Sequence, residues 1–124
     1  MATLELTAEN FASSVSGAGI TIVDFWAAWC GPCRMFGPIF EEASTKHPDI
    51  KFGKVNTEEQ QQLAAQAGIS SIPTLMVFRE NVLLYNQPGA LPAANFEDLI
   101  AQVRALDMEK VHEQIAAEAN QSAE

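Results

Sequence analysis

Both cysteines of the chain lie in one short stretch, where two thiols can exchange with a disulfide. Cys30 and Cys33 are separated only by Gly31 and Pro32. Thiols at this spacing can close a small ring, and Pro32 suits a first helical turn because its missing N–H would be unpaired there anyway. The stretch therefore predicts thiol–disulfide chemistry at the junction between a strand and a helix.

The two cysteines are expected to act in turn. Cys30 would lie at the mouth of the helix, where free backbone N–H groups and the helix dipole favour a thiolate. Because the thiolate is the form that attacks a disulfide, Cys30 would form a mixed disulfide with the substrate. Cys33, one turn further in, is expected to be shielded and to attack Cys30, which releases the reduced substrate.

The alternatives for the cysteine pair are an inert pair and a structural metal site. Zinc usually takes four ligands, but His47 and His112 lie in unrelated segments and there is no second Cys-x-x-Cys. We therefore expect no metal ion, and we interpret the two histidines as surface residues.

The composition predicts a single acidic domain. With 124 residues, 48% of them apolar, the chain is long enough to bury a core. Its net charge of −9, with only seven Lys and Arg, argues against nucleic acid as a partner. Residues 1–10 lack the cationic start and apolar run of a secretory signal, and no stretch reaches the length of a membrane span. We expect a cytoplasmic protein without a membrane partner.

Apolar and β-branched runs predict five strands. The run at 20–26 suits a central strand covered on both faces, and the β-α-β order predicts that it is parallel to the next strand. The last two strands would pair antiparallel across a connection that lacks glycine, so Asn81 is expected to take a positive φ. The five strands are expected at 3–6, 20–26, 50–55, 74–78 and 82–85.

Helical spacing of apolar residues predicts the remaining elements. Thr7 and Thr57 are expected to cap two of the helices, and Gly68 is placed to end the second of these. Between them a helix over 32–47 would contain Pro38 as a kink. Met35 and Phe36 in this helix are expected in the core.

The last helix carries an apolar stripe from Phe96 to Val103. Met108, Val111 and Ile115 would prolong it with a shifted phase around Asp107, and residues from Glu118 onward are expected to fray. We therefore divide the chain into a domain over residues 1–107 and a C-terminal helical extension with a frayed tail over 108–124.

Several of these residues together resemble the thioredoxin family, over roughly residues 3–106. A bare Cys-x-x-Cys is weak evidence, but Trp-Cys-Gly-Pro-Cys with a distant Ile-Pro-Thr is specific. The resemblance implies an α/β thioredoxin fold, a five-stranded mixed sheet flanked by helices on both faces. It is carried by Asp24-Phe25-Trp26, Trp29-Cys30-Gly31-Pro32-Cys33, Pro38, Lys54, Ile72-Pro73-Thr74 and Gly89.

The resemblance also implies a substrate-binding surface. In the family the bond before the proline is cis, which leaves the backbone of Ile72 free to hydrogen-bond an extended substrate. Gly89 would lie beside Pro73, where its missing side chain lets a partner approach. Trp29 follows the strand end and should flank this surface, whereas Trp26 should pack against the core. Substrate contact is therefore assigned to Trp29, Gly31, Pro32, Ile72, Pro73 and Gly89.

Asp24 is an acidic residue in an otherwise apolar strand. Burial of its charge is costly, so we expect it to be partly protonated or paired, with Lys54 as the candidate partner. The resemblance implies that Asp24 assists proton transfer to or from Cys33 through water. The alternatives are a structural carboxylate for Asp24 and a solvated strand residue for Lys54.

The resemblance implies a protein-disulfide reductase that uses the Cys30–Cys33 couple and binds no cofactor itself. An NADPH-dependent thioredoxin reductase would regenerate the dithiol, and we expect a monomer. Two alternatives stay open. A binding module would use the apolar rim around Trp29, Ile72, Pro73 and Ala90 and would keep its activity in Cys30→Ser. A donor dedicated to one enzyme would dock through the C-terminal helix.

Overall fold

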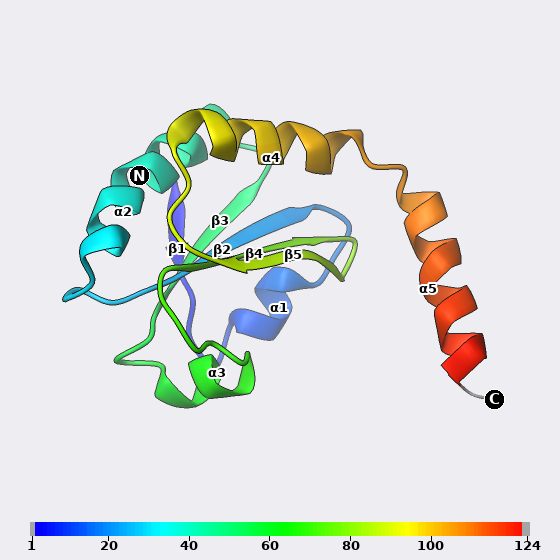
Figure 1. The fold of residues 1–124 in the computed structure, drawn as a ribbon, viewed down its shortest axis with the longest axis horizontal. Coiled ribbons are helices and arrows are strands. Elements are labelled where there is room, and N and C mark those ends of the chain that lie inside the picture. Colours follow the sequence, from blue (N-terminus) through cyan, green and yellow to red (C-terminus); the bar gives the residue numbers. More distant parts are fainter. Residues whose placement is uncertain (1, 123–124) are drawn as a thin grey trace.

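The computed structural model describes residues 2–122 and contains one mixed sheet of five strands in the order β1-β3-β2-β4-β5 (Figure 1). β1 and β2 run parallel to β3, whereas β4 runs antiparallel to β2 and β5. The predicted α/β class and the central place of β2 are therefore confirmed. The strands are β1 (Thr3–Glu5), β2 (Ile20–Trp26), β3 (Lys51–Asn56), β4 (Thr74–Arg79) and β5 (Val82–Pro88).

Helices cover both faces of this sheet. Figure 1 shows α4 on the opposite side of the sheet from α1 and α3, and α2 shares the side of α4. α5 stands away from the sheet beyond the end of α4. Within residues 2–122 the helices are α1 (Phe11–Val15), α2 (Gly31–Lys46), α3 (Gln61–Gln66), α4 (Ala93–Ala105) and α5 (Met108–Ser122).

The larger core lies between the sheet and the pair α2 and α4. Side chains alternate along β2, so Ile22 joins this core while Val23 points to the other face. Phe36 of α2 meets Phe96 of α4 edge to face with ring centroids 5.3 Å apart, and Phe40 packs in the same cluster. These contacts fix α2 on the sheet at the end where the cysteines lie.

The smaller core lies under α1 and α3 and depends on a close approach at one glycine. Phe25 and Val55 pack here with Leu6 and with Phe11 of α1. A Cβ atom at Gly53 would overlap the buried side chain of Leu6. Glycine at this position therefore lets the chain after β1 lie against β3.

Both predicted threonine caps are wrong. The Asn10 side chain accepts a hydrogen bond of 2.7 Å from the Thr7 N–H, so a turn occupies this segment and α1 begins only at Phe11. Thr57 donates to the carbonyl of Trp26 through its N–H at 2.9 Å and its hydroxyl at 3.0 Å, before α3 begins. Both threonines bond within turns or to a neighbouring strand instead of capping a helix.

Within α2, one of the two predicted core residues is exposed. Phe36 is buried as expected. Met35, one position earlier on the helix, points away from the sheet and is 74% exposed. Pro38 lies inside the helix without ending it. Gly68 follows α3 with φ 73°, as its predicted place after the helix requires.

The turn between β4 and β5 uses two residues with positive φ. Asn81 has φ 64°, as predicted, but Glu80 also takes φ 52°. Two such residues give the turn that matches the twist of a hairpin. The Glu80 carboxylate then lies 3.0 Å from Nε2 of His112 in α5, so the hairpin contacts the C-terminal helix.

The predicted continuous C-terminal helix is broken between α4 and α5. Leu106 has an extended conformation, with φ −63° and ψ 138°. Arg79 of β4 donates from Nη1 to the carbonyl oxygens of Val103 at 2.8 Å and Leu106 at 3.3 Å. These contacts satisfy carbonyls at the end of α4, which would otherwise need the next helical turn.

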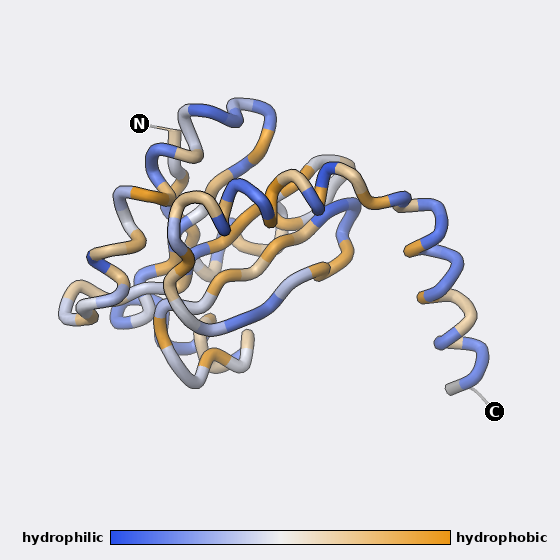
Figure 2. Tube along the Cα trace, turned by 45° about the horizontal axis from the view of Figure 1, so that its top comes forward, coloured by the Kyte–Doolittle hydropathy of each residue, from blue (hydrophilic) through white to orange (hydrophobic). Residues whose placement is uncertain are grey.

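α5 contacts the rest of the chain only slightly. Figure 2 shows it as a largely hydrophilic helix that leads away from the sheet. Met108 is its one buried residue among those with a described side chain. The helix continues to Ser122, past the predicted start of the frayed tail at Glu118, and residues 123–124 lie outside the described chain. No helix within residues 2–122 combines the length and apolar character that crossing a bilayer requires.

Candidate active site

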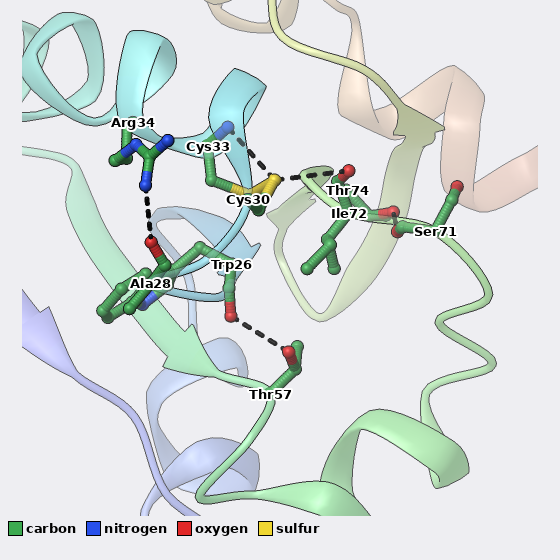
Figure 3. The surroundings of a disulfide bond; sticks show 9 residues. All are labelled: Trp26, Ala28, Cys30, Cys33, Arg34, Thr57, Ser71, Ile72 and Thr74. Atoms are coloured by element: carbon green, nitrogen blue, oxygen red, sulfur yellow. Dashed lines mark hydrogen bonds between the residues drawn. A yellow bond between two sulfur atoms is a disulfide. The ribbon is translucent and has the colours of Figure 1, made fainter.

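The two cysteines form a disulfide at the beginning of α2 (Figure 3). Cys30 is the N-cap residue, and its Sγ accepts a hydrogen bond of 3.2 Å from the Cys33 N–H. Pro32 occupies the first turn, where its missing N–H leaves no donor unpaired. The partial positive charge at the start of a 16-residue helix thus lies at the Cys30 sulfur, as predicted.

The expected difference in shielding between the two cysteines is absent. Cys30 and Cys33 are each 4% exposed, and they pack with Ala27, Trp26 and Ile72 in a small cluster. Cys30 is covered because the loop before β4 lies against it. The two sulfurs therefore differ in their position on α2 and in their contacts, and not in the exposure of the residues.

The Ile72–Pro73 loop forms the opposite wall of the site. The bond between these residues is cis, as the family resemblance implied. The Ile72 carbonyl oxygen lies 3.7 Å from Cys30 Sγ, a contact without a hydrogen bond because a disulfide sulfur carries no proton. Gly89, at φ 106°, donates its N–H to the Pro73 carbonyl at 2.8 Å. The structure thus brings Ile72 to the disulfide and places Gly89 beside Pro73, as predicted.

Trp29 forms the exposed rim of the site. Trp29 is 67% exposed and lies three residues after the end of β2, whereas Trp26 is half-buried beside the cysteines. A groove of about 350 Å³ runs from Trp29 to Ile72 over the N-terminal side of the loop. Ile69 adds an apolar side chain to its lining.

Asp24 lies in the middle of β2 and is buried without a hydrogen-bond partner among residues 2–122. Its residue is 1% exposed, and no donor among residues 2–122 hydrogen-bonds to either carboxylate oxygen. Burial raises the pKa of Asp24 from 3.8 to about 7, although the positive charge of Lys54 acts in the opposite direction. The prediction of a perturbed carboxyl is therefore confirmed.

The predicted ion pair between Asp24 and Lys54 is absent. Lys54 Nζ instead lies 3.7 Å from Oε1 of Glu41 in α2 and 5.0 Å from the centroid of the Trp26 ring. Sequence reasoning missed Glu41, because a glutamate on a helix ordinarily indicates a solvated surface. Only the packing of α2 against the sheet brings its carboxylate to Lys54.

The histidines lie outside the redox site. His47 is half-buried, with Nε2 2.8 Å from Glu97 Oε1 and Nδ1 3.0 Å from Arg104 Nη2. Arg104 also binds Asp49 through two hydrogen bonds and lowers the pKa of that carboxyl to about 2. Within residues 2–122, no three side chains of the types that ligate metals gather in one place.

Comparison with known proteins agrees with this geometry. The family model described as Thioredoxin matches residues 2–102. A protein of Streptomyces coelicolor named "Putative thioredoxin 2" is 52% identical over 120 residues, which cover 97% of this chain and 90% of that relative. A thioredoxin of Alicyclobacillus acidocaldarius is 41% identical over 103 residues, 82% of this chain and 98% of its own. The solved structure of Malassezia sympodialis thioredoxin (Mala s 13) superposes with a TM-score of 0.72 at 31% identity, covering 82% of this chain and 91% of the other.

Proposed function

Because the chain belongs to the thioredoxin family and is a thiol–disulfide oxidoreductase, we propose that it acts as a protein-disulfide reductase in the cytoplasm. One observation carries the proposal. The Cys30–Cys33 disulfide lies at the start of α2, 3.7 Å from the backbone of Ile72 and beside the exposed Trp29. A redox pair at a helix N-terminus, next to backbone that a substrate strand can reach, suits exchange with disulfides of other proteins.

The reaction proceeds by two thiol–disulfide exchanges. The Cys30 thiolate attacks one sulfur of the substrate disulfide, so a mixed disulfide forms and one substrate thiolate leaves. Cys33 loses its proton and attacks the Cys30 sulfur, which restores the Cys30–Cys33 bond and releases the second substrate thiolate. Two electrons pass from the dithiol to the substrate. The N-terminal end of α2 stabilises the attacking thiolate of Cys30.

Asp24 is proposed to accept the proton of Cys33 in the second exchange. A carboxyl with a pKa of about 7 is matched to this transfer near neutral pH, because it gains and loses its proton in that range. Neither of its oxygens receives a hydrogen bond from residues 2–122, so a water molecule can link them to the thiol.

Substrate binding is assigned to the two segments that flank the disulfide. An extended substrate would hydrogen-bond the backbone of Ile72, while Gly89 keeps the adjacent surface free of a side chain. Trp29, Gly31 and Pro32 would form the other side of the contact. Protein disulfides are the proposed substrates, an NADPH-dependent thioredoxin reductase is the proposed electron source, and the proposed working unit is a monomer.

The redox equilibrium of the cysteine pair tests the proposed direction of the reaction. The protein is equilibrated with buffers of defined thiol–disulfide potential, and tryptophan fluorescence reports the state of the disulfide because Trp29 adjoins it. Thioredoxins themselves set the reference, at about −270 mV, against about −120 mV for a strong periplasmic oxidant. We expect a value near the first. Cys30→Ser should abolish the transition.

Other outcomes identify the alternatives. A potential near that of the periplasmic oxidant would replace the reductase with an oxidase. A biological activity that persists in Cys30→Ser would favour a binding module that uses the rim around Trp29 and Ile72. Loss of reduction for one partner enzyme alone, after removal of residues 108–124, would favour a dedicated electron donor.

A further inference from the structure

Glu41 of α2 is a carboxylate held between the first strand and the lysine next to Asp24. Its Oε1 accepts a hydrogen bond of 2.9 Å from the Thr3 hydroxyl and lies 3.7 Å from Lys54 Nζ. Its Oε2 is buried and receives no hydrogen bond from residues 2–122. A charged group held in this way costs free energy unless it is compensated, so its position calls for a reason beyond solubility.

Lys54 is placed to reach either of two carboxylates. It is the register partner of Asp24 across the parallel strands β2 and β3, so both side chains lie on the α2 side of the sheet. Its ammonium group nevertheless pairs with Glu41 and lies over the ring of Trp26, 5.0 Å from the centroid. No ion pair joins it to Asp24.

We propose that Glu41 is a positioning residue of the redox reaction: it holds the Lys54 ammonium over Trp26 and away from Asp24, so that the Asp24 carboxylate can take the proton of Cys33. The inference rests on the proposed function, in which Asp24 is that proton acceptor. Glu41 itself touches neither substrate nor sulfur in this arrangement.

The effect follows from the distance between opposite charges. An ammonium in contact with a carboxylate lowers the pKa of the acid by 1–3 pH units, which would make Asp24 a weak base toward a thiol. Complete loss of the lysine would raise the pKa of Asp24 instead, so the carboxyl would stay protonated at neutral pH and could not accept a proton. A lysine that Glu41 holds nearby, but out of contact, gives the Asp24 carboxylate an intermediate basicity.

Other charged groups near the pair are few. On the sheet, β4 places the uncharged Leu75 opposite Asp24, and α2 presents Cys33, which does not titrate while it is in the disulfide. Glu5 of β1 is the register partner of Lys54. Glu5, Lys54 and Glu59 all line one open groove of about 290 Å³. Neither Glu5 nor Glu59 comes within ion-pair distance of Lys54, which leaves Glu41 as its acidic contact among residues 2–122.

The test measures the titration of Asp24 in the oxidised protein by carbon NMR of its carboxyl group. Glu41→Gln keeps an oxygen for the Thr3 hydroxyl but removes the charge that holds Lys54. We expect the apparent pKa of Asp24 to fall by about one pH unit. Glu42→Gln is the matched control, because it removes the same charge from the next residue, and Glu42 forms its ion pair with the exposed Lys46 and not with Lys54. It should leave the Asp24 titration unchanged.

Lys54→Met separates two ways in which Glu41 can change the pKa of Asp24: by positioning Lys54, or by the direct repulsion between the two carboxylates. In that background, Glu41→Gln should no longer move the Asp24 pKa. The pH profile for release of substrate from the mixed disulfide should show the same pattern, with its acid limb at lower pH in Glu41→Gln alone. Equal shifts in Glu41→Gln and Glu42→Gln would overturn the inference, as would an undiminished shift in the Lys54→Met background.

The proposed function is tested separately by Asp24→Asn. If this variant released substrate as fast as the unmodified protein, Asp24 would not be the proton acceptor, even if Glu41→Gln moved its pKa. If release slowed while Glu41→Gln left the Asp24 titration in place, only the role of Glu41 would fail.

Discussion

Asp24 is the residue at which folding and chemistry oppose each other. Its carboxyl lies in the central strand with 1% exposure and no protein hydrogen bond among residues 2–122. Desolvation favours the neutral acid, and the nearby Lys54 only partly offsets this. A core residue chosen for stability alone would be apolar here, so the buried carboxyl supports the proposed role of Asp24 in proton transfer.

The buried carboxyl predicts a pH-dependent loss of stability. Because its pKa rises from 3.8 to about 7 on folding, the folded protein binds this proton more tightly than the unfolded chain. The resulting stabilisation is complete below pH 4 and is lost as the pH rises to about 7. Asp24→Asn cannot titrate, so the difference in unfolding free energy between the two proteins should change by about 4 kcal/mol between pH 3.5 and 8. Urea unfolding at several pH values measures it.

The comparison with Asp24→Asn removes contributions from other groups. Asp49, whose pKa is lowered by Arg104, titrates in both proteins and therefore cancels in the difference. A difference that stays constant from pH 3.5 to 8 would contradict a raised pKa for Asp24.

The pairing of β1 with β3 shows how one element is placed by the absence of a side chain. β1 is a three-residue edge strand, and the buried Leu6 that follows it packs directly over Gly53. The same edge supplies Thr3, which binds Glu41 of α2. Correct seating of β1 therefore matters for the core and for the charges beside the redox site.

Gly53→Ala should destabilise the protein by about 1–3 kcal/mol, because its Cβ would overlap Leu6 and force this side chain to move. Chemical denaturation measures the loss. Gly19→Ala is the control, since no atom lies within 4 Å of a Cβ built there, and it should have little effect.

A second substitution tests the cause of that loss. In a Leu6→Ala background the overlap is relieved, so Gly53→Ala should cost clearly less than it does alone. Equal costs in the two backgrounds would mean that Leu6 is not the obstacle.

At the scale of the whole molecule, the redox domain and α5 are nearly separate. The family match ends at residue 102, before α5 begins at Met108. The Streptomyces coelicolor relative matches 97% of this chain, so the likeness continues into α5. We propose that residues 1–107 form the working domain and that 108–124 serve another purpose, such as recognition of one partner.

Removal of residues 108–124 should lower the unfolding free energy by about 1–2 kcal/mol, mainly through loss of the buried Met108. The truncated protein should reduce insulin disulfides at an unchanged rate. The Cys30–Cys33 disulfide lies at the N-terminal end of α2, on the opposite side of the molecule from α5 (Figure 1). Thermal unfolding and an insulin-reduction assay measure the two effects. Met108→Ala in the full chain should reproduce most of the stability loss, and a truncated protein unable to reduce insulin would refute the division.

The sequence by itself determined the features that depend on neighbours along the chain. The continuous run of apolar and β-branched residues in 20–26 indicated a central strand, because a strand covered on both faces needs apolar side chains on each of them. The Cys-Gly-Pro-Cys stretch indicated a helix start with a redox pair because proline and helix dipole act within one turn. The buried Asp24 carboxyl could be inferred for the same reason, since its own strand is apolar.

Only the tertiary structure decided which side chains meet across the fold. Lys54 lies near both Asp24 and Glu41. Because α2 packs on the sheet at this point, Lys54 forms its ion pair with Glu41 and not with Asp24. Arg79 ended α4 by binding carbonyls more than twenty positions away, which no local pattern indicates. The loop before β4 covers Cys30, so Cys30 is as buried as Cys33. Such contacts depend on strand order and register, because these place residues distant in the chain side by side.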